Sequence, residues 1–343
     1  MSEWKKCKLG DVITFQRGHD LPKTKMVIGT FPVAGSNGII GFHNKATTKG
    51  PGVTIGRSGN IGTPVFYSKD YWAHNTVLYI KDFKDSSPKF IYYFLNTFDF
   101  SQFNAGSAVP TLNRNHIHEL NVTIPEKPEQ IQIASILSSL DDKIDLLQRQ
   151  NKTLEQLAET LFRQWFLEEV EESWEVGKLG DIAALFNGKS RPKEVVNGSI
   201  PVYGGNGILG FTDKSNYSGV SIIIGRVGAY CGSLYLENRE IWVSDNALLT
   251  KPRHDDCPYF LFYLLKSLHL NSMAEGSSHP LLTQTLLNSI EIIIPPKEKI
   301  FAFDFQAKEF WNKINYNQIQ IRTLTQLRDT LLPKLMSGEV RVI

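Results

Sequence analysis

The amino-acid sequence repeats itself after 169 to 170 residues. Residues 8–11 (Lys-Leu-Gly-Asp) return at residues 178–181, and residues 55–57 (Ile-Gly-Arg) return at residues 224–226. A period of this length is much longer than the unit of a solenoid and is close to the size of a domain. The 343-residue chain is therefore predicted to hold two copies of one fold, and two copies of a binding module suggest a target with two parts.

Composition and cysteine content narrow the class of protein. Hydrophobic residues make up 41% of the chain and charged residues 21%, as in ordinary globular proteins. No uninterrupted apolar stretch approaches about 18 residues and no apolar run follows the N-terminus, so neither a membrane span nor a signal peptide is expected. Cys7, Cys231 and Cys257 do not repeat between the halves, which indicates a reducing cytoplasm rather than a disulfide framework or a zinc site.

Each repeat has a globular part followed by a helical part. The predicted domains are residues 1–125 and 173–296, and the predicted long helices lie in residues 126–172 and 297–343. The net charge is +6 for the first domain and −1 for the second, and it is −6 and +3 for the two helical segments. The first domain is thus expected to bind a polyanion, whereas net charge alone does not predict this for the second domain.

Both globular parts are predicted to have a mixed α+β fold. They are rich in glycine, aromatic and β-branched residues, with frequent turn signals. Runs typical of strands lie at residues 52–55, 77–80 and 220–224. Short helices are expected over residues 90–98 and 259–268, opened by Pro88 and Pro258.

The helical parts carry a heptad pattern. In the first, nine positions follow one another at spacings of three or four residues, and all but one are apolar or aromatic: Leu137, Leu140, Ile144, Leu147, Asn151, Leu154, Ala158, Leu161 and Trp165. The positions 170 residues later continue in phase: Ala307, Phe310, Ile314, Asn317, Ile321, Leu324, Arg328, Leu331 and Leu335. This spacing predicts two long helices with coiled-coil seams, each of about 35 residues and roughly 50 Å.

Two such helices in one chain are expected to pair with each other as an antiparallel coiled coil, with the two domains at opposite ends. One antiparallel register aligns Asn151 with Asn317 and matches a positions with d positions throughout. A buried pair of asparagines fixes the register at some cost in stability. The alternative is that each helix forms its seam with another subunit.

The sequence contains no convincing motif of a catalytic, metal or cofactor site. Residues 205–210 fit the spacing of a dinucleotide-binding loop, but no helix is expected after them and the first copy has Ser36 at the first glycine, so a turn between strands is preferred. His116 and His118 have no histidine counterparts in the second copy, which argues against a metal site. No cofactor and no metal are expected in this chain.

Polar and basic residues in loops are the candidates for DNA contact. Arg pairs with guanine and Asn or Gln with adenine in the major groove, while Lys more often holds phosphate. In the first domain the candidates are Arg17, Asn37, His43, Asn44, Lys45, Arg57, Asn60, Asn113 and Arg114. In the second domain they are Lys189, Arg191, Asn206, Lys214, Arg226, Thr283 and Gln284. The alternative for each of them is an ordinary solvated side chain.

Arg57 and Arg226 are the strongest individual candidates. Each follows Ile-Gly and is followed by one residue and a further glycine, so a glycine-flanked turn is expected to hold the arginine in position for readout. The alternative is a packing role that both copies keep for folding. Trp72 and Trp242 also recur, and both are expected in the core.

Several segments resemble the specificity subunits of Type I restriction-modification systems. The resemblance is carried by residues 124–141, which contain Pro-Glu-Gln-Ile at residues 128–131, by residues 143–148 and by residues 331–340. The segments that also fit are the Lys-Leu-Gly-Asp openings after Trp4 and Trp174 and the Gly-Ser-x-x-Pro segments at Gly106 and Gly276. In the second copy the Pro-Glu-Gln pattern is degraded, because residues 295–300 read Pro-Pro-Lys-Glu-Lys-Ile.

The resemblance implies two homologous target-recognition domains and two long helices that pair as an antiparallel coiled coil. It also implies a non-catalytic subunit that reads double-stranded DNA at a bipartite site, and the site is expected to be asymmetric because residues 111–114 and 281–284 differ between the two domains. Two methyltransferase subunits and, for cleavage, restriction subunits would be its partners. S-adenosylmethionine, ATP and magnesium would belong to those partners.

Two other interpretations stay open at this point. A structural adaptor would join protein partners and leave DNA to them, and the neutral second domain favours it. An enzyme with an unrecognised site would reveal itself by methyl transfer or DNA cleavage in the purified chain alone.

Overall fold

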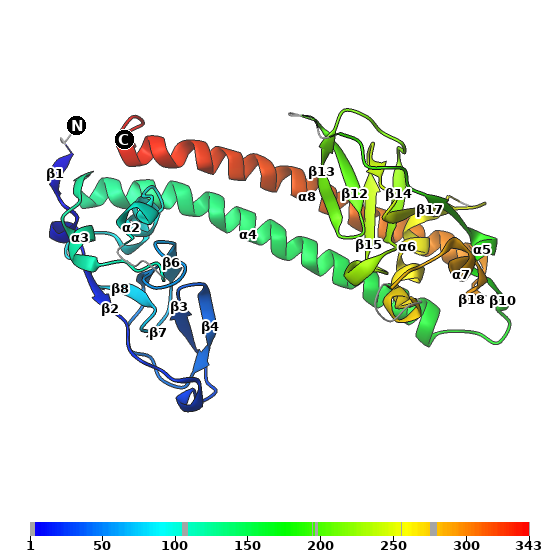
Figure 1. The fold of residues 1–343 in the computed structure, drawn as a ribbon, viewed down its shortest axis with the longest axis horizontal. Helices are drawn as coiled ribbons and strands as arrows, with labels where there is room; N and C mark the ends of the chain where they lie inside the picture. The colour runs from blue at the N-terminus through cyan, green and yellow to red at the C-terminus, as the bar shows by residue number, and fades with distance from the viewer. Residues whose placement is uncertain are drawn as a thin grey trace. The chain divides into compact units, whose positions relative to one another are not determined.

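The computed structural model describes residues 4–104, 109–193, 195, 198–254, 256–274 and 280–342. Two compact units divide the chain: unit 1 is Met1–Leu147 with Ile319–Ile343, and unit 2 is Gln148–Gln318. Each unit therefore combines a globular part with portions of both long helices (Figure 1). The four segments predicted from the sequence divide the chain differently and stay a prediction about domains. Gly106 and Gly276 of the Gly-Ser-x-x-Pro segments lie outside the described residues.

The globular part of unit 1 contains three small sheets. The four-stranded antiparallel sheet has the order β2 (Thr14–Arg17), β8 (Val77–Asp82), β5 (Gly52–Gly56), β6 (Pro64–Tyr67). The three-stranded sheet has the order β4 (Gly38–His43), β3 (Phe31–Gly35), β7 (Trp72–Ala73), with β7 parallel to β3. The two-stranded sheet pairs β1 (Lys5–Lys8) with β9 (Asn121–Ile124).

Short helices lie between these strands in the chain. They are α1 (Leu9–Val12), η1 (Lys23–Lys25), α2 (Pro88–Leu95), η2 (Phe100–Phe103) and α3 (Arg114–His118). The helix predicted after Pro88 is present, but it includes the proline and ends before Asn96. Its buried side chains, among them Phe90 and Ile91, share one core with Leu137 of the first long helix and Leu335 of the second.

Unit 2 repeats the three sheets and the α-helices of this arrangement, whereas η1 of unit 1 and η4 of unit 2 lie at different places in the order of elements. Its strands form a four-stranded sheet of β11 (Ala183–Asn187), β17 (Ala247–Pro252), β14 (Val220–Gly225) and β15 (Leu234–Asn238), a three-stranded sheet of β13 (Gly207–Thr212), β12 (Ile200–Gly204) and β16 (Trp242–Val243), and the pair β10 (Glu175–Lys178) and β18 (Glu291–Ile294). Its short helices are α5 (Leu179–Ile182), η4 (Gly228–Tyr230), α6 (Pro258–Ser267), η5 (Leu270–Met273) and α7 (Gln284–Ser289). The predicted duplication of one mixed α+β fold is thus confirmed.

The repeated Lys-Leu-Gly-Asp segment forms the same helix start in both units. Asp11 accepts a hydrogen bond from the backbone N–H of Lys8 at 3.0 Å, and Asp181 accepts one from Lys178 at 2.7 Å. A small residue is favoured after the leucine because α3 approaches closely: a Cβ on Gly10 would lie 3.0 Å from the Cβ of His118. An acidic residue and a small residue at these positions therefore explain why the segment recurs.

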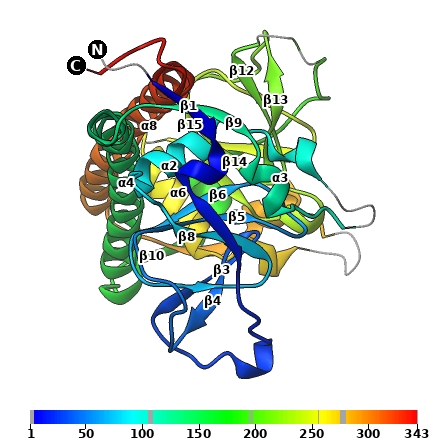
Figure 2. The same ribbon diagram turned by 90° about the vertical axis from the view of Figure 1, so that its left-hand side faces the viewer.

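The two predicted long helices are present. α4 spans Lys127–Arg163 and continues as a π-helical turn, η3 (Gln164–Glu168), while α8 spans Lys297–Ser337. All eighteen positions of the predicted heptad pattern are buried or half-buried. In each unit the segments of α4 and α8 lie side by side, as Figure 2 shows from a second direction.

Polar contacts join the two helices within each unit. In unit 1, Arg328 donates to Asp141 at 2.9 Å. In unit 2, the amide of Asn317 donates to Asn151 Oδ1 at 2.9 Å, and Asn317 is fully buried. The helices are therefore antiparallel and the two asparagines face each other, as the sequence aligned them. The role of this pair in fixing the register stays a prediction.

The Pro-Glu-Gln pattern and its degraded copy are explained by contacts within the chain. Gln130 is buried, and its Oε1 accepts from Ser87 N, just before α2, at 2.9 Å. In unit 2, Ile300 takes the place of this glutamine. Asp304, one helical turn later, accepts from Phe260 N near the start of α6 at 2.9 Å instead. Both copies thus anchor the equivalent short helix to a long helix, but with different residues.

Two expectations about individual side chains are wrong. Trp72 and Trp242 are half-buried rather than core residues, because the two-residue strands β7 and β16 lie at one side of their three-stranded sheets. His43 is not a solvated loop side chain. It is buried, its Nδ1 lies 3.0 Å from Val27 N, and its ring contacts Trp72 edge-on with a centroid distance of 5.1 Å.

Candidate nucleic-acid interface

Several of the predicted residues lie at one end of the four-stranded sheet of unit 1, where β2 and β5 end; we call this end the sheet edge. β2 and β5 both run antiparallel to β8, so that Arg17 lies opposite Leu78 and Gly56 lies opposite Val77. The ends of β2 and β5 therefore flank the beginning of β8. This geometry brings Arg17 and Arg57 to the same edge of the sheet, although forty residues separate them in the chain.

The backbone holds Arg57 on both sides. Its N–H donates to Thr76 O at 2.8 Å, and its carbonyl accepts from Leu112 N at 2.9 Å. The preceding glycine is required, since a Cβ on Gly56 would lie 1.8 Å from Asn60 O. The predicted glycine-flanked turn thus does position the arginine, and its side chain is half-buried at the sheet edge.

The guanidinium of Arg57 is in a cationic environment. Burial and the nearby Arg17 lower the pKa of Arg57. Its Nη1 contacts the carbonyl of Asn75 at 3.5 Å, and Asn75 in turn donates to Asp20. Asp20 forms an ion pair with Arg17 at 4.0 Å. Crowded arginines at an edge of this kind favour an anionic or hydrogen-bond-accepting ligand.

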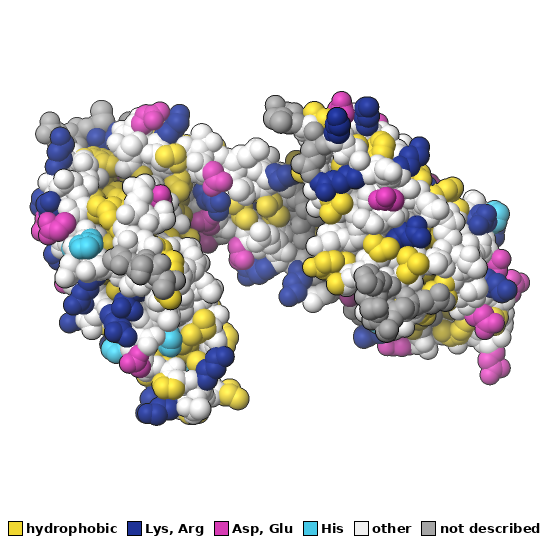
Figure 3. Space-filling view, in the orientation of Figure 1, with side chains coloured by type: hydrophobic (Ala, Val, Ile, Leu, Met, Phe, Trp, Pro, Cys, Tyr) yellow, Lys and Arg dark blue, Asp and Glu magenta, His cyan; other side chains and the backbone are white. Residues whose placement is uncertain are grey.

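A shallow hollow of about 740 Å³ lies beside this edge. It is lined by Arg17, His19, Thr47, Trp72 and Arg114, together with Gln16, Gly18 and Asp20. Arg114 begins α3 and is exposed. Figure 3 shows Lys, Arg and His side chains close together on the globular part of unit 1. The structure therefore brings three of the predicted arginines, Arg17, Arg57 and Arg114, into one region.

The equivalent edge of unit 2 has the same backbone and different side chains. Arg226 donates its N–H to Asn246 O at 3.1 Å and accepts from Leu282 N at 2.9 Å. The repeat places Asn187 where unit 1 has Arg17, and Gln284 where it has Arg114. The Nη1 of Arg226 donates to Asn187 Oδ1 at 3.3 Å. Amides at the positions of two arginines thus contribute to the lower net charge of the second domain.

Asn187 is the residue that the sequence analysis missed. It ends β11 opposite Leu248 and contacts the strongest candidate of its unit. The repeat offset that equates it with Arg17 is the signal that could have identified it. Asp20 and Asn75 were missed as well, because their contacts depend on loops that meet only in the folded unit.

The glycine-rich segments form hairpins, as predicted. β3 and β4 meet at Asn37, and β12 and β13 meet at Asn206, with Gly38 at φ +94° and Gly207 at φ +79°. Both asparagines are exposed. The hairpins also expose apolar side chains at equivalent positions, which are Ile39, Ile40 and Phe42 in unit 1 and Ile208, Leu209 and Phe211 in unit 2. Repeated exposed apolar side chains at hairpins indicate a contact surface.

Four further predicted residues, Lys45, Lys189, Arg191 and Lys214, follow strands or contact a hairpin. Lys45 and Lys214 follow the hairpins and are exposed. Lys189 follows β11, and its backbone N–H donates to Val243 O at 3.0 Å. Arg191 donates from Nη2 to Leu209 O at 3.0 Å, which ties it to the second hairpin. Their contact with DNA stays a prediction.

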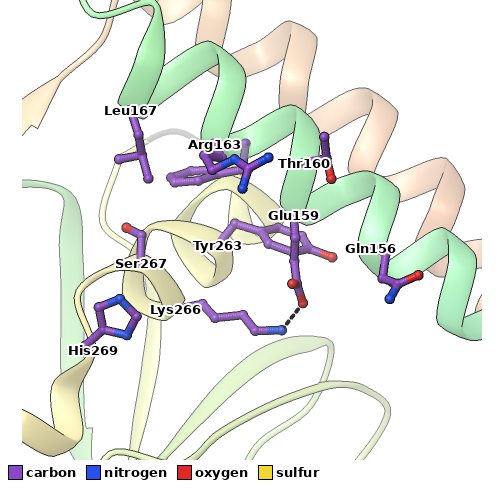
Figure 4. A pocket seen from close by; sticks show the side chains of 10 residues that line it. Gln156, Glu159, Thr160, Arg163, Leu167, Tyr263, Lys266, Ser267 and His269 are labelled. Carbon is purple, nitrogen blue, oxygen red and sulfur yellow. Dashed lines mark hydrogen bonds and ion pairs between the residues drawn. The ribbon is translucent and has the colours of Figure 1, made fainter.

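A separate hollow of about 600 Å³ lies in unit 2 between the end of α4 and α6 (Figure 4). An ion pair between Lys266 and Glu159 crosses it, and Tyr263 and Phe162 form part of its wall. Burial raises the pKa of Tyr263. The hollow contains none of the residues predicted to contact DNA, so we do not include it in the candidate interface.

Two other kinds of feature, a metal site and a membrane-spanning helix, are absent from the part of the chain that the structure describes. No cluster of three or more His, Cys, Asp or Glu side chains in that part has the arrangement of a metal site. Among the same residues, no helix is long and apolar enough to cross a membrane.

Comparison with known proteins identifies the family. The chain belongs to the family of Type I restriction modification DNA specificity domains, which matches residues 1–156 and 171–331. It is similar to the specificity subunit of the Type I restriction enzyme MjaIX from Methanocaldococcus jannaschii, with 28% identity over 326 residues, 79% of this chain and 74% of that protein. The HindI specificity subunit from Haemophilus influenzae is 25% identical over 334 residues, 67% of this chain and 71% of that protein.

A solved structure shares the whole fold. The S subunit of a Type I restriction-modification system from M. genitalium aligns with a TM-score of 0.74 at 20% identity, over 97% of this chain and 96% of that chain. The predicted family and fold class are thus confirmed. Specificity subunits are the non-catalytic components of restriction-modification complexes, so this chain has a role in DNA sequence specificity rather than in catalysis.

Proposed function

We propose that the chain reads an interrupted, asymmetric DNA site, with one half-site for each unit. The observation that carries this proposal is the duplicated sheet edge: Arg57 and Arg226 have the same backbone contacts but different neighbours. Two equivalent platforms suit two similar pieces of duplex DNA. Different side chains on those platforms suit two different base sequences.

The two half-sites differ in the chemistry that would read them. Unit 1 presents Arg17, Arg57 and Arg114, which are suited to guanine and to phosphate oxygens. Unit 2 presents Arg226 with the amides of Asn187 and Gln284, and amides are suited to adenine. The site is therefore proposed to be asymmetric in sequence. The remaining candidates, Asn37, Lys45, Lys189, Arg191, Asn206 and Lys214, are proposed as further DNA contacts.

The long helices are proposed to dock two copies of a methyltransferase subunit. Both helices expose large apolar side chains at positions that the repeat equates, and each is roughly half exposed: Ile131 with Phe301, Leu146 with Tyr316, and Leu157 with Leu327. Within each helix, spacings of about four and three turns keep these side chains near one face. A patch that occurs twice suits two identical partners.

Restriction subunits are proposed as further partners for cleavage. S-adenosylmethionine, ATP and magnesium are proposed to act in the partner subunits, and the bacterial or archaeal cytoplasm, where the host DNA lies, is the proposed location. The helix pair is proposed to set the gap between the half-sites.

Mapping of methylated adenines tests the proposed function directly. The chain would be expressed in a methylation-free host together with its neighbouring methyltransferase subunit, and alone as the control. We expect an interrupted, asymmetric motif only when both are present. A stable complex that methylates no defined motif would contradict DNA reading by this chain.

The near-neutral net charge of the second domain favours one alternative function, that of a structural adaptor that binds proteins only. The two functions differ in how the isolated chain binds duplex DNA as salt increases. Release of counterions from phosphates makes the affinity of a DNA reader fall steeply with salt concentration. An adaptor would show no measurable affinity at low salt.

A further inference from the structure

The contacts at the two ends of the helix pair have opposite polarity. In unit 1, Glu129 near the start of α4 is buried, and Arg341 from the segment after α8 binds it through two nitrogens at 2.5 and 2.7 Å. In unit 2, Lys299 near the start of α8 pairs with Glu169 from the segment after α4 at 3.7 Å. The repeat equates Glu129 with Lys299. The helix start is therefore acidic in one unit and basic in the other.

A tryptophan lies under the cation at each end. Arg341 lies 5.6 Å from the ring centre of Trp4, and Lys299 lies 5.0 Å from that of Trp174. The two tryptophans occupy equivalent positions in the repeat. Each has a cation over its ring, but the cation comes from the segment after the opposite helix in unit 1 and from the helix start in unit 2. The exchange of charge thus leaves the cation–π contact unchanged.

The centre of the helix pair has a second asymmetric feature. With Asn151 opposite Asn317, the antiparallel register places Leu147 opposite Ile321. The repeat, however, equates Asn151 with Ile321 and Leu147 with Asn317. Amide therefore meets amide and apolar meets apolar only when the first helix pairs with the second helix.

From these contacts we propose that the helix interface accepts the unlike half of the chain and rejects a second copy of the same half. If α4 paired with α4 of another chain in the same register, Asn151 would face Leu147, and buried Glu129 would face the acidic run Glu168–Glu172. Trp4 would then have no cation. If α8 paired with α8, Asn317 would face Ile321, and Lys299 would meet Arg341 over Trp174.

Like-with-like pairing therefore leaves an amide without its partner or brings like charges together, and the positions affected include Glu129 and Asn317, which are buried in the observed pair, and Lys299 and Arg341, which are half-buried. The contact between Arg328 and Asp141 adds to the selection, because the repeat equates these residues with Ala158 and Trp311. A repeated chain of this kind can in principle assemble as symmetric pairs of one half. The interface ensures instead that every assembled reader carries both units.

The test uses the intact, folded chain, cut after purification. A protease recognition sequence is inserted between Glu172 and Ser173, which are both exposed, and the chain is cleaved while folded. The two fragments are incubated under conditions that allow exchange, and native mass spectrometry then identifies the pairs. We expect only the pair of first with second fragment. Like pairs in statistical proportions would overturn the proposal.

A double charge exchange tests the ends of the helix pair. Glu129→Lys with Arg341→Glu restores opposite charges in unit 1, but it gives both helices a basic start and an acidic end. We expect the intact variant to keep the melting temperature of the wild type and the cleaved variant to form like pairs. A matched control exchanges the exposed ion pair of Lys127 and Asp85, which lies outside the helix interface and is expected to leave the selection intact.

Replacing the two central asparagines is an independent test, which stays informative if the charge exchange prevents folding. Asn151→Leu with Asn317→Leu removes the central mismatch of like pairs, so the share of like pairs is expected to increase in the cleaved chain. If both double variants continue to form only unlike pairs, neither the charges nor the asparagines select the partner, and the proposal is wrong.

Discussion

At the scale of single residues, equivalent positions differ in what surrounds them more than in how the backbone holds them. Arg57 and Arg226 have matching backbone hydrogen bonds, yet Arg57 faces a second arginine and Arg226 faces an amide. The backbone contacts depend on glycines and strand ends that both copies keep. The neighbours are surface side chains, which can change without loss of the fold. Specificity can therefore vary while the platform stays constant.

We expect Arg57→Ala to impair recognition of one half-site and Arg226→Ala to impair recognition of the other. Loss of a bidentate base contact weakens binding by about 1–3 kcal/mol, or roughly 5- to 150-fold, at the affected position only. Binding to DNA in which each half-site is varied separately measures this. Lys69→Ala, in an exposed turn away from the sheet edge, is the control. Equal loss on all sequences would instead identify phosphate contacts.

A buried carboxyl group predicts a pH dependence of stability. Burial raises the pKa of Asp304 to about 6, against an unfolded value of about 3.9. The folded state therefore keeps the proton at pH values at which the unfolded chain has lost it. The free energy of unfolding should thus fall as the pH rises from about 4 to about 6 and remain lower above that range.

Asp304→Asn should remove this dependence, because the amide oxygen can still accept from Phe260 N and carries no charge. At pH 7 the free energy of unfolding is expected to rise by on the order of 2 kcal/mol. Denaturant unfolding at several pH values measures the effect. Asp213→Asn, an exposed carboxylate in the same unit, should leave the profile unchanged. A wild-type profile that is flat between about pH 4 and 6 would contradict the assignment.

At the scale of elements, the two long helices combine a regular seam with a few polar exceptions. The seam positions follow the heptad pattern, while Asn151, Asn317 and Arg328 interrupt it. Asn317 is fully buried, and its Oδ1 has no hydrogen-bond partner among the described residues. Such groups lower stability and specify pairing. The helix pair is thus selective at the expense of some stability.

Replacing both asparagines by leucine should raise the melting temperature and loosen the spacing of the two units. The double variant removes buried amides from an apolar seam, which is worth on the order of 1–2 kcal/mol and a few degrees in a chain of this size. Asn151→Leu alone should lower the melting temperature, because Asn317 then keeps a buried donor without its partner. Calorimetry of the three proteins measures this. A lower melting temperature in the double variant would contradict the prediction.

At the scale of the whole molecule, the proposed function needs the two units to be separated by a fixed length of helix. Seven residues inserted into both helices, after Leu154 and before Ile314, add two turns without breaking the heptad phase. The helix pair would lengthen by about 10 Å, or roughly three base pairs. We expect the methylated motif to gain spacer length while both half-sites keep their bases.

Methylation mapping of the lengthened variant measures the change. A variant with the same number of residues replaced by other heptad-compatible residues, and none inserted, is the control. Altered bases in either half-site would show that the helices do more than separate the units.

Local patterns in the sequence were sufficient for the duplication, the strands at Gly52, Val77 and Val220, and the long helices. Periodicity and turn residues act over a few positions, so they can be recognised without a structure. The facing of Asn151 and Asn317 also followed from the sequence, because a long heptad pattern leaves few registers.

The tertiary structure alone decided which distant residues meet. Strand pairing through β8 brings Arg17 to Arg57 in unit 1, and strand pairing through β17 brings Asn187 to Arg226 in unit 2. The burial of His43 and the half-exposure of Trp72 depend on how the small sheets end. Arg341 meets Glu129 from more than 200 residues away. Contacts of this kind depend on register between elements, on which local propensity has no influence, so a single sequence does not contain a local signal for them.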